Sequence, residues 1–199
     1  MTDVMDYPDG AIPLDPDEME GLKFKHISTR GELDQLEQAG ITNGMKWSDK
    51  QKNLDILSEA FVCELHKRLF GDVWKWAGSF RKTEKNIGVD PFQIATQLRQ
   101  LLDDAKYWVE YSTYPPKELA ARFHHKLVYI YPFPNGNVRH ARIITDAVLT
   151  KLLSEPAINW AGGYRLESMN DRRNEYIAAL RAADGHDFSE LLNFVGAGE

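Results

Sequence analysis

The chain has 199 residues, of which 43% are hydrophobic and 27% are charged, and its formal net charge at pH 7 is −6. This length supports one sizeable hydrophobic core or at most two small domains. General nucleic-acid binding needs a basic surface, so the acidic balance argues against nucleic acid as a partner. A local basic site for a nucleotide remains compatible with it.

Cysteine usage and hydropathy indicate the compartment. The single cysteine, Cys63, excludes an internal disulfide and fits a reducing environment. No apolar run approaches the length of a membrane-spanning helix. The N-terminal sequence MTDVMDYPDG is acidic, unlike the apolar stretch of a signal peptide. We therefore expect a cytoplasmic protein without a membrane partner.

The first part of the chain predicts an arm followed by two helices. Residues 1–27 are rich in proline and acidic residues, which predicts an extended N-terminal arm. Ser28 or Thr29 then caps a short helix over residues 30–38, and Gly40 ends it. Apolar residues at three- and four-residue spacing predict a second helix from Ser48 to Phe70.

Residues 72–92 change character, because they are aromatic and basic and have no helical period. Two short runs, 80–83 and 87–89, flank the turn residues 84–86. This pattern predicts a short β-hairpin, the single β element that the sequence indicates.

The remaining apolar runs predict a helical bundle. Helical periodicity recurs in five segments: 91–108, 117–130, 139–153, about 168–183, and 188–195. With the earlier helices the total is about seven, arranged around a central helix-loop-helix. We predict an all-α fold in which residues 28–199 form a single domain, with its core over about residues 47–197.

The loop between two of these apolar helices, residues 131–142, reads YPFPNGNVRHAR. Gly136 lets the backbone approach a ligand closely. The N–H groups at the start of the following helix attract anions. Arg139 and Arg142 are three residues apart, so they project from one side of that helix. This stretch predicts a phosphate-binding site, and a polyphosphate fits it well.

A plainer interpretation of the same residues stays open. Asn137 can cap the helix, and the two arginines can lie at the surface, paired with acids such as Asp146. On that interpretation the loop is structural and binds nothing.

The loop resembles the signature HxFx[DE]GNGRxxR of Fic proteins, and it is similar to a bacterial branch of that family whose loop reads HPFPNGNGRHAR. The segment Leu65–Arg81, LHKRLFGDVWKWAGSFR, resembles the part of Fic proteins that precedes their flap hairpin. The similarity extends over most of the chain from about Leu14. The signature positions that match are Phe133, Gly136, Asn137, Arg139 and Arg142.

The resemblance implies a helical enzyme that transfers AMP from ATP, with Mg²⁺, to a hydroxyl of a target protein. Tyr131 occupies the position of the catalytic histidine, and Asn135 occupies the position of the metal ligand. A tyrosine of the late helix, Tyr176, is implied to line the adenine pocket, although its helical spacing fits a core aromatic equally well. The implied nucleotide-binding residues are Asn135, Gly136, Asn137, Val138, Arg139, Arg142 and Tyr176.

The resemblance also implies partners and regulation. The hairpin is the flap on which a target protein docks as an added strand. An antitoxin, or self-inhibition by a glutamate of an inhibitory helix, is the regulation found in the family. Glu32 and Glu37 are the candidates here, and a solvated acid is the plainer interpretation of both. The implied target-docking residues are Arg81, Lys82, Thr83, Ile87 and Gly88.

The chain departs from the Fic signature at three positions that bear on catalytic activity, Tyr131, Asn135 and Val138. Tyrosine, with a pKa near 10, is a poor general base at pH 7, at a cost of about 4 kcal/mol relative to a group that is already deprotonated. Val138 replaces a glycine and narrows the anion site, and Asn135 is a weaker Mg²⁺ ligand than a carboxylate. We do not expect another histidine to replace it. His140 lies on a different side of its helix from Arg142, and His124 and His125 lie more than a turn back in the preceding helix.

These observations favour an adenylyltransferase with impaired activity. Two alternatives remain: an inactive pseudoenzyme that binds nucleotide or target, and a Doc-like phosphotransferase that binds the nucleotide differently.

Overall fold

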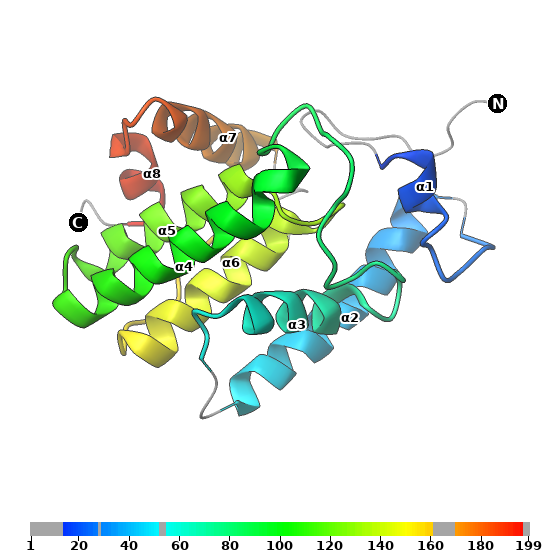
Figure 1. The fold of residues 1–199 in the computed structure, drawn as a ribbon, viewed down its shortest axis with the longest axis horizontal. Coiled ribbons are helices and arrows are strands. Elements are labelled where there is room, and N and C mark those ends of the chain that lie inside the picture. The colour runs from blue at the N-terminus through cyan, green and yellow to red at the C-terminus, as the bar shows by residue number, and fades with distance from the viewer. Residues whose placement is uncertain (1–13, 28, 52–54, 161–169, 197–199) are drawn as a thin grey trace.

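A computed structural model describes residues 14–27, 29–51, 55–160 and 170–196 (Figure 1). In these residues it contains eight α-helices, a 3₁₀ turn and a π-helical turn. The elements in chain order are α1 (Pro16–Met19), α2 (Arg30–Lys50), α3 (Glu59–Phe70), η1 (Pro91–Gln93), α4 (Ile94–Tyr111), α5 (Pro116–Ile130), α6 (Asn137–Ala147), η2 (Val148–Leu152), α7 (Asn170–Asp184) and α8 (Ser189–Phe194).

The predicted all-α architecture is confirmed. Helices α5 and α6 pack against each other at the centre and are joined by the loop over residues 131–136. Helix α4 packs against α5, and the pair α2–α3 packs against α6. Helices α7 and α8 pack against α5, away from α2 and α3 (Figure 1). Most residues of both central helices are buried, so the loop between them is anchored in the interior at both ends.

The boundary between the first two long helices was predicted wrongly. Helix α2 runs through Gly40 and ends at Lys50, and α3 begins only at Glu59, with Ser58 as its N-cap. A Cβ on Gly40 would lie 2.5 Å from the carbonyl oxygen of Leu69. The glycine therefore serves the close approach of α2 to α3 rather than the end of a helix.

The predicted β-hairpin is not seen. In the described part of the chain no residues form a strand, and the β pairing present is one isolated bridge between Leu22 and Trp74. Residues 80–89 instead form turns and loops whose two legs are held together by the side chain of Arg81. An arginine thus replaces the backbone ladder that a hairpin would use.

The predicted arm contains a short helix and lies on the bundle. The N–H of Lys23 donates to the carbonyl of Val73, and the N–H of Lys75 donates to the carbonyl of Gly21, both at 2.9 Å. These bonds place α1 beside the predicted flap. No helix among the described residues is long and apolar enough to cross a membrane.

Candidate functional site

The chain reverses direction at Tyr131, immediately after α5. This residue adopts a left-handed conformation with φ 51° and ψ 62°, which is unusual for a residue with a Cβ. Its carbonyl oxygen accepts a hydrogen bond from Nε of Arg81 at 2.7 Å. The strained turn is therefore held from outside by the predicted flap segment.

Arg81 is the clamp that holds this turn. Its side chain was predicted to meet a target, but the residue is only 3% exposed and its guanidinium donates into the protein. The receiving oxygens belong to two segments, the end of α5 and the flap, and a cation at a helix C-terminus is favourable there. Besides Tyr131, the acceptors are the carbonyl oxygens of Thr83 at 2.9 Å, Val89, and Ile130 at 3.5 Å.

The second half of the loop is fixed by Asn137 and Gly136. The Asn137 side chain accepts from the N–H of Phe133 at 2.8 Å and donates to the carbonyl of Phe133 at 2.7 Å. Gly136 has φ +77°, and a Cβ there would lie 2.6 Å from the ring of Phe70. The glycine is therefore required for the shape of the loop, and the Asn137 amide closes the loop on itself.

A buried histidine that sequence reasoning missed also supports the loop. The N–H of Gly78 donates to Nδ1 of His66 at 3.0 Å, so Nε2 carries the proton and donates to the carbonyl of Asn135 at 3.0 Å. The imidazole stacks on the ring of Phe133 with 3.7 Å between centroids. The sequence did offer one indication of this role, because His66 lies on the apolar face of the helix predicted to end at Phe70.

The phenol of Tyr131 is poorly suited to accept a proton. The residue is only 6% exposed, and burial raises its pKa above the ordinary value of 10. A hydrogen bond with Asn137 and the charges of Arg139 and Arg81 act in the opposite direction, but burial exceeds them. In the folded protein, Tyr131 is therefore an even weaker base than the ordinary pKa of tyrosine indicates.

The first loop arginine, Arg139, pairs with Glu37 of α2. Its guanidinium lies 2.6 Å from Oε2 of Glu37, which is completely buried, and over the ring of Phe70 at 4.9 Å. The other oxygen of Glu37 accepts from the indole of Trp74 at 2.7 Å. Glu32, the other candidate acid, lies in the capping box of α2 with Thr29.

Three further residues of the predicted nucleotide site lie in or beside the core. Arg142 is only 1% exposed. Tyr176 is buried, and its hydroxyl lies 2.8 Å from Nε2 of His124, so its side chain is built into the core. Val138 lies in the first turn of α6 and is partly buried against the hydrophobic core. The loop therefore brings together residues 131–139, whereas Tyr176 belongs to the packing between α5 and α7.

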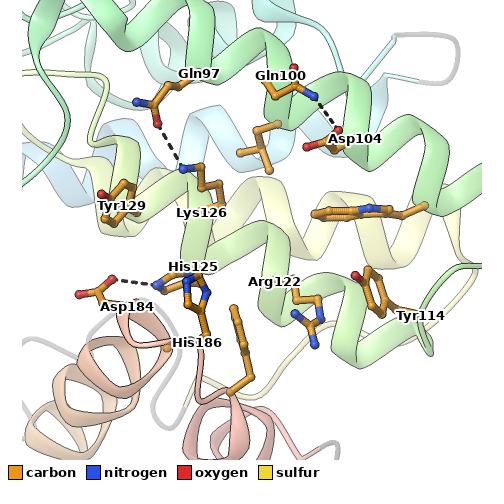
Figure 2. Close-up of a pocket in the computed structure, with 14 residues that line it drawn as sticks. Gln97, Gln100, Asp104, Tyr114, Arg122, His125, Lys126, Tyr129, Asp184 and His186 are labelled. Atoms are coloured by element: carbon orange, nitrogen blue, oxygen red, sulfur yellow. Dashed lines mark hydrogen bonds and ion pairs between the residues drawn. The ribbon is translucent and has the colours of Figure 1, made fainter.

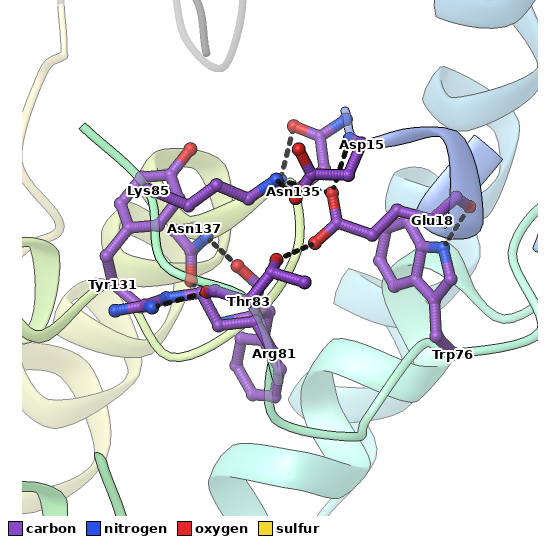
Figure 3. A network of polar contacts seen from close by, with 11 residues as sticks. Asp15, Glu18, Trp76, Arg81, Thr83, Lys85, Tyr131, Asn135 and Asn137 are labelled. Carbon is purple, nitrogen blue, oxygen red and sulfur yellow. Dashed lines mark hydrogen bonds and ion pairs between the residues drawn. The ribbon is translucent and has the colours of Figure 1, made fainter. Parts of the chain in front are cut away.

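The predicted flap is covered in part by the arm (Figure 3). The ammonium of Lys85, whose side chain is 3% exposed, lies 2.8 Å from Asp15 and 2.5 Å from Glu18. The hydroxyl of Thr83 donates to Glu18 at 3.1 Å. Lys82, Ile87 and Gly88 are exposed. Of the five predicted docking residues, these last three are the accessible ones.

The three histidines considered as substitutes for the missing base are engaged by other parts of the core. Nε2 of His140 lies 3.0 Å from the carbonyl of Val62, and burial lowers its pKa to about 4. His124 bonds to Tyr176, and burial, with the charge of Arg142, lowers its pKa to about 3. His125 bonds to Asp184 on the opposite side of α5.

Comparison with known proteins decides the family. A family model described as Fic/DOC matches residues 56–149, which include α3, the predicted flap, α5 and the whole loop. These residues are a domain of the Fic/DOC family. In this Fic chain, the position of the signature histidine is held by Tyr131.

Curated relatives carry the name protein adenylyltransferase. The Fic chain is 29% identical over 152 residues to Protein adenylyltransferase fic-1 of Caenorhabditis elegans, covering 72% of this chain and 27% of that protein. It is 26% identical over 174 residues to Protein adenylyltransferase Fic of Nematostella vectensis, covering 84% and 36%. The chain thus spans little more than a third of these relatives at most.

Solved structures share the fold. Fic-1 (residues 134–508) from C. elegans matches with a TM-score of 0.62 and 25% identity, covering 89% of this chain and 56% of that one. BepC from Bartonella tribocorum, with bound AMPPNP, matches with a TM-score of 0.68 and 15% identity, covering 91% and 96%. The second likeness is one of fold alone.

The residues of this loop fit Mg²⁺ only weakly. The side-chain oxygen of Asn135 accepts the N–H of Gly136 at 2.7 Å, which leaves it one lone pair. Among the described residues, no three side chains from His, Cys, Asp and Glu gather as a metal site. A metal at this loop would therefore depend on phosphate oxygens for most of its ligands.

Proposed function

We propose that this chain is a Fic-type protein adenylyltransferase whose transfer activity is impaired by Tyr131. In the reaction, a base takes the proton of the target hydroxyl, whose oxygen attacks the α-phosphorus of ATP, and pyrophosphate leaves. The observation that carries the proposal is the buried phenol at the position of the base, with its pKa raised. The family match and the names of the relatives support the reaction class.

The phosphates of ATP would lie at the start of α6, whose first turn presents backbone N–H groups. When bound, Mg²⁺ would neutralise phosphate charge, with the Asn135 oxygen as a protein ligand. Arg139 would bind the outer phosphates after it leaves Glu37. The target protein would dock on the exposed part of the flap, Lys82, Ile87 and Gly88.

A second function, a non-transferring binding module, is favoured by one observation. Asn137 and Arg139, two of the implied phosphate ligands, are already engaged with Phe133 and Glu37. Such a chain would bind a target or a partner such as an antitoxin and leave ATP unreacted. A Doc-like phosphotransfer, in which the γ-phosphate moves instead of AMP, is the third alternative.

Incubation of the natural chain with a cell lysate and ATP labelled at either the α- or the γ-phosphate separates these functions. Slow incorporation of α-label into protein supports the adenylyltransferase. Incorporation of γ-label alone supports phosphotransfer and contradicts the proposal. Absence of both labels, with ATP binding detected by calorimetry, supports the binding module.

Regulation by Glu37 is part of the proposal. We expect Glu37→Gln to keep the hydrogen bond from Trp74 but to release Arg139 for phosphate, so ATP binds roughly tenfold more tightly. Glu32→Gln is the matched control, because a glutamine serves equally in the capping box of α2. Equal ATP affinities of both variants and the natural chain, measured by calorimetry, would show that Glu37 does not restrain the site.

A further inference from the structure

A cavity lies outside the Fic loop, between α4, α5 and the turn from α7 to α8 (Figure 2). Its volume is about 640 Å³, within the usual range for small-molecule sites. None of its lining residues belongs to the loop over residues 131–142. Any ligand of this cavity is therefore separate from the nucleotide proposed above.

The floor of the cavity is one face of α5. Arg122, Lys126 and Tyr129 follow one another at four- and three-residue spacing, so their side chains line the same side of the helix. Arg122 is already engaged: its guanidinium lies 2.7 Å from Glu118 and 4.5 Å from the centroids of two rings, Tyr114 and Phe188. The charge of Arg122 is therefore already paired within the protein.

Lys126 differs from Arg122 in its charge balance. Its ammonium donates to the neutral amide oxygen of Gln97 at 3.2 Å and lies 4.5 Å from the ring centroid of Tyr129. Across the described ranges, no carboxylate lies at ion-pair distance from it. A partly buried ammonium beside an amide and a ring, with its charge uncompensated, favours an anionic ligand.

The remaining walls restrict the kind of anion. Leu101, Trp108 and Phe188 supply apolar and aromatic surface, which suits a flat organic body. Two carboxylates, Asp104 and Asp184, also line the cavity. Because they repel a highly charged ligand, a single anionic group is favoured over a triphosphate.

We propose that this cavity binds a small organic anion in which one carboxylate or phosphate group is attached to a planar aromatic body. The anionic group pairs with Lys126 and accepts from the amide of Gln97 or Gln100. The aromatic body packs against Trp108 and Phe188. This site is independent of the proposed transfer activity and needs no residue of the Fic loop.

The test is a titration of the ¹⁵N-labelled natural chain, followed by NMR, with 2-naphthoate, 2-naphthyl phosphate and the neutral 2-naphthamide. We expect saturable shifts centred on α5 and on residues 183–188 with at least one of the two anions, and binding about tenfold weaker with the amide. Which anion binds more tightly assigns the ligand as a carboxylate or a phosphate.

Lys126→Met should weaken binding of the preferred anion about tenfold, and the NMR spectrum of the variant should remain that of a folded protein. Lys46→Met, which removes one positive charge from an exposed position of α2, is the matched control and should bind as the natural chain does. The proposal is overturned if shifts do not saturate, if they do not cluster at the cavity, if the amide binds equally well, or if the two lysine variants behave alike.

Discussion

His66, His124 and His140 are fully buried in the helical core, and burial lowers the pKa of each below the ordinary 6.5. The native state therefore holds them neutral at a pH at which the unfolded chain would protonate them. Since the unfolded state then binds more protons, the free energy of unfolding must fall as the pH decreases below 6.5.

This loss has a predicted size. With pKa values of about 3 for His124 and about 4 for His140, each contributes a slope approaching 1.4 kcal/mol per pH unit between pH 6 and 4.5. Urea unfolding should show about 3 kcal/mol less stability at pH 5.5 than at pH 6.5 for the three histidines together. His186→Gln, at an exposed position, should leave the slope unchanged. Constant stability across this range would contradict the neutral assignment.

At the residue scale, the sequence predicted which residues gather at the loop but not their hydrogen bonds. Gly136 and Arg139 do lie together at the start of α6, as their spacing indicated. Spacing along one helix, however, carries no information about partners from other helices. The pairing of Arg139 with Glu37 and the support from His66 depend on the packing of α2 and α3, which no local pattern specifies.

At the element scale, Gly40 determines how closely α2 and α3 pack. We expect Gly40→Ala to destabilise the protein by about 1–3 kcal/mol, because the new Cβ would meet the carbonyl of Leu69 at 2.5 Å. Gly31→Ala, in the same helix but with nothing within 4 Å of its new Cβ, should stabilise by up to about 1 kcal/mol. Urea unfolding of both variants checks this. Stabilisation by both would show that the helices can separate without cost.

The hydrophobic periodicity of the sequence predicted the long helices well, but it predicted the positions of the breaks between them less well. Helices α4 and α5 follow strongly amphipathic runs that begin near Pro91 and Pro116, and the structure confirms both. A glycine inside a helix, however, predicted a helix end, and two short runs on either side of turn residues, 80–83 and 87–89, predicted strands. Gly40 and the clamp of Arg81 show that tertiary contacts decided both cases.

At the scale of the whole molecule, the buried ammonium of Lys85 joins the flap to the arm. We expect Lys85→Met to leave Glu18 without its cation, to destabilise the fold by about 2 kcal/mol, and to speed hydrogen exchange over residues 81–89. Lys82→Met is the matched control at the neighbouring exposed lysine and should change the free energy of unfolding by less than about 0.5 kcal/mol. Unchanged exchange in the Lys85 variant would show that the arm does not restrain the flap.

Tyr131 is the residue that, in the function proposed above, limits AMP transfer. The direct measurement is the rate of incorporation of α-labelled ATP into protein by the natural chain, by Tyr131→His and by Tyr129→His, which adds a histidine on the exposed face of α5 two residues earlier. We predict that Tyr131→His raises the rate roughly 10²- to 10⁴-fold, the usual contribution of a general base, and that Tyr129→His leaves it unchanged. A Tyr131→His variant that binds ATP but transfers AMP no faster than the natural chain would contradict the claim.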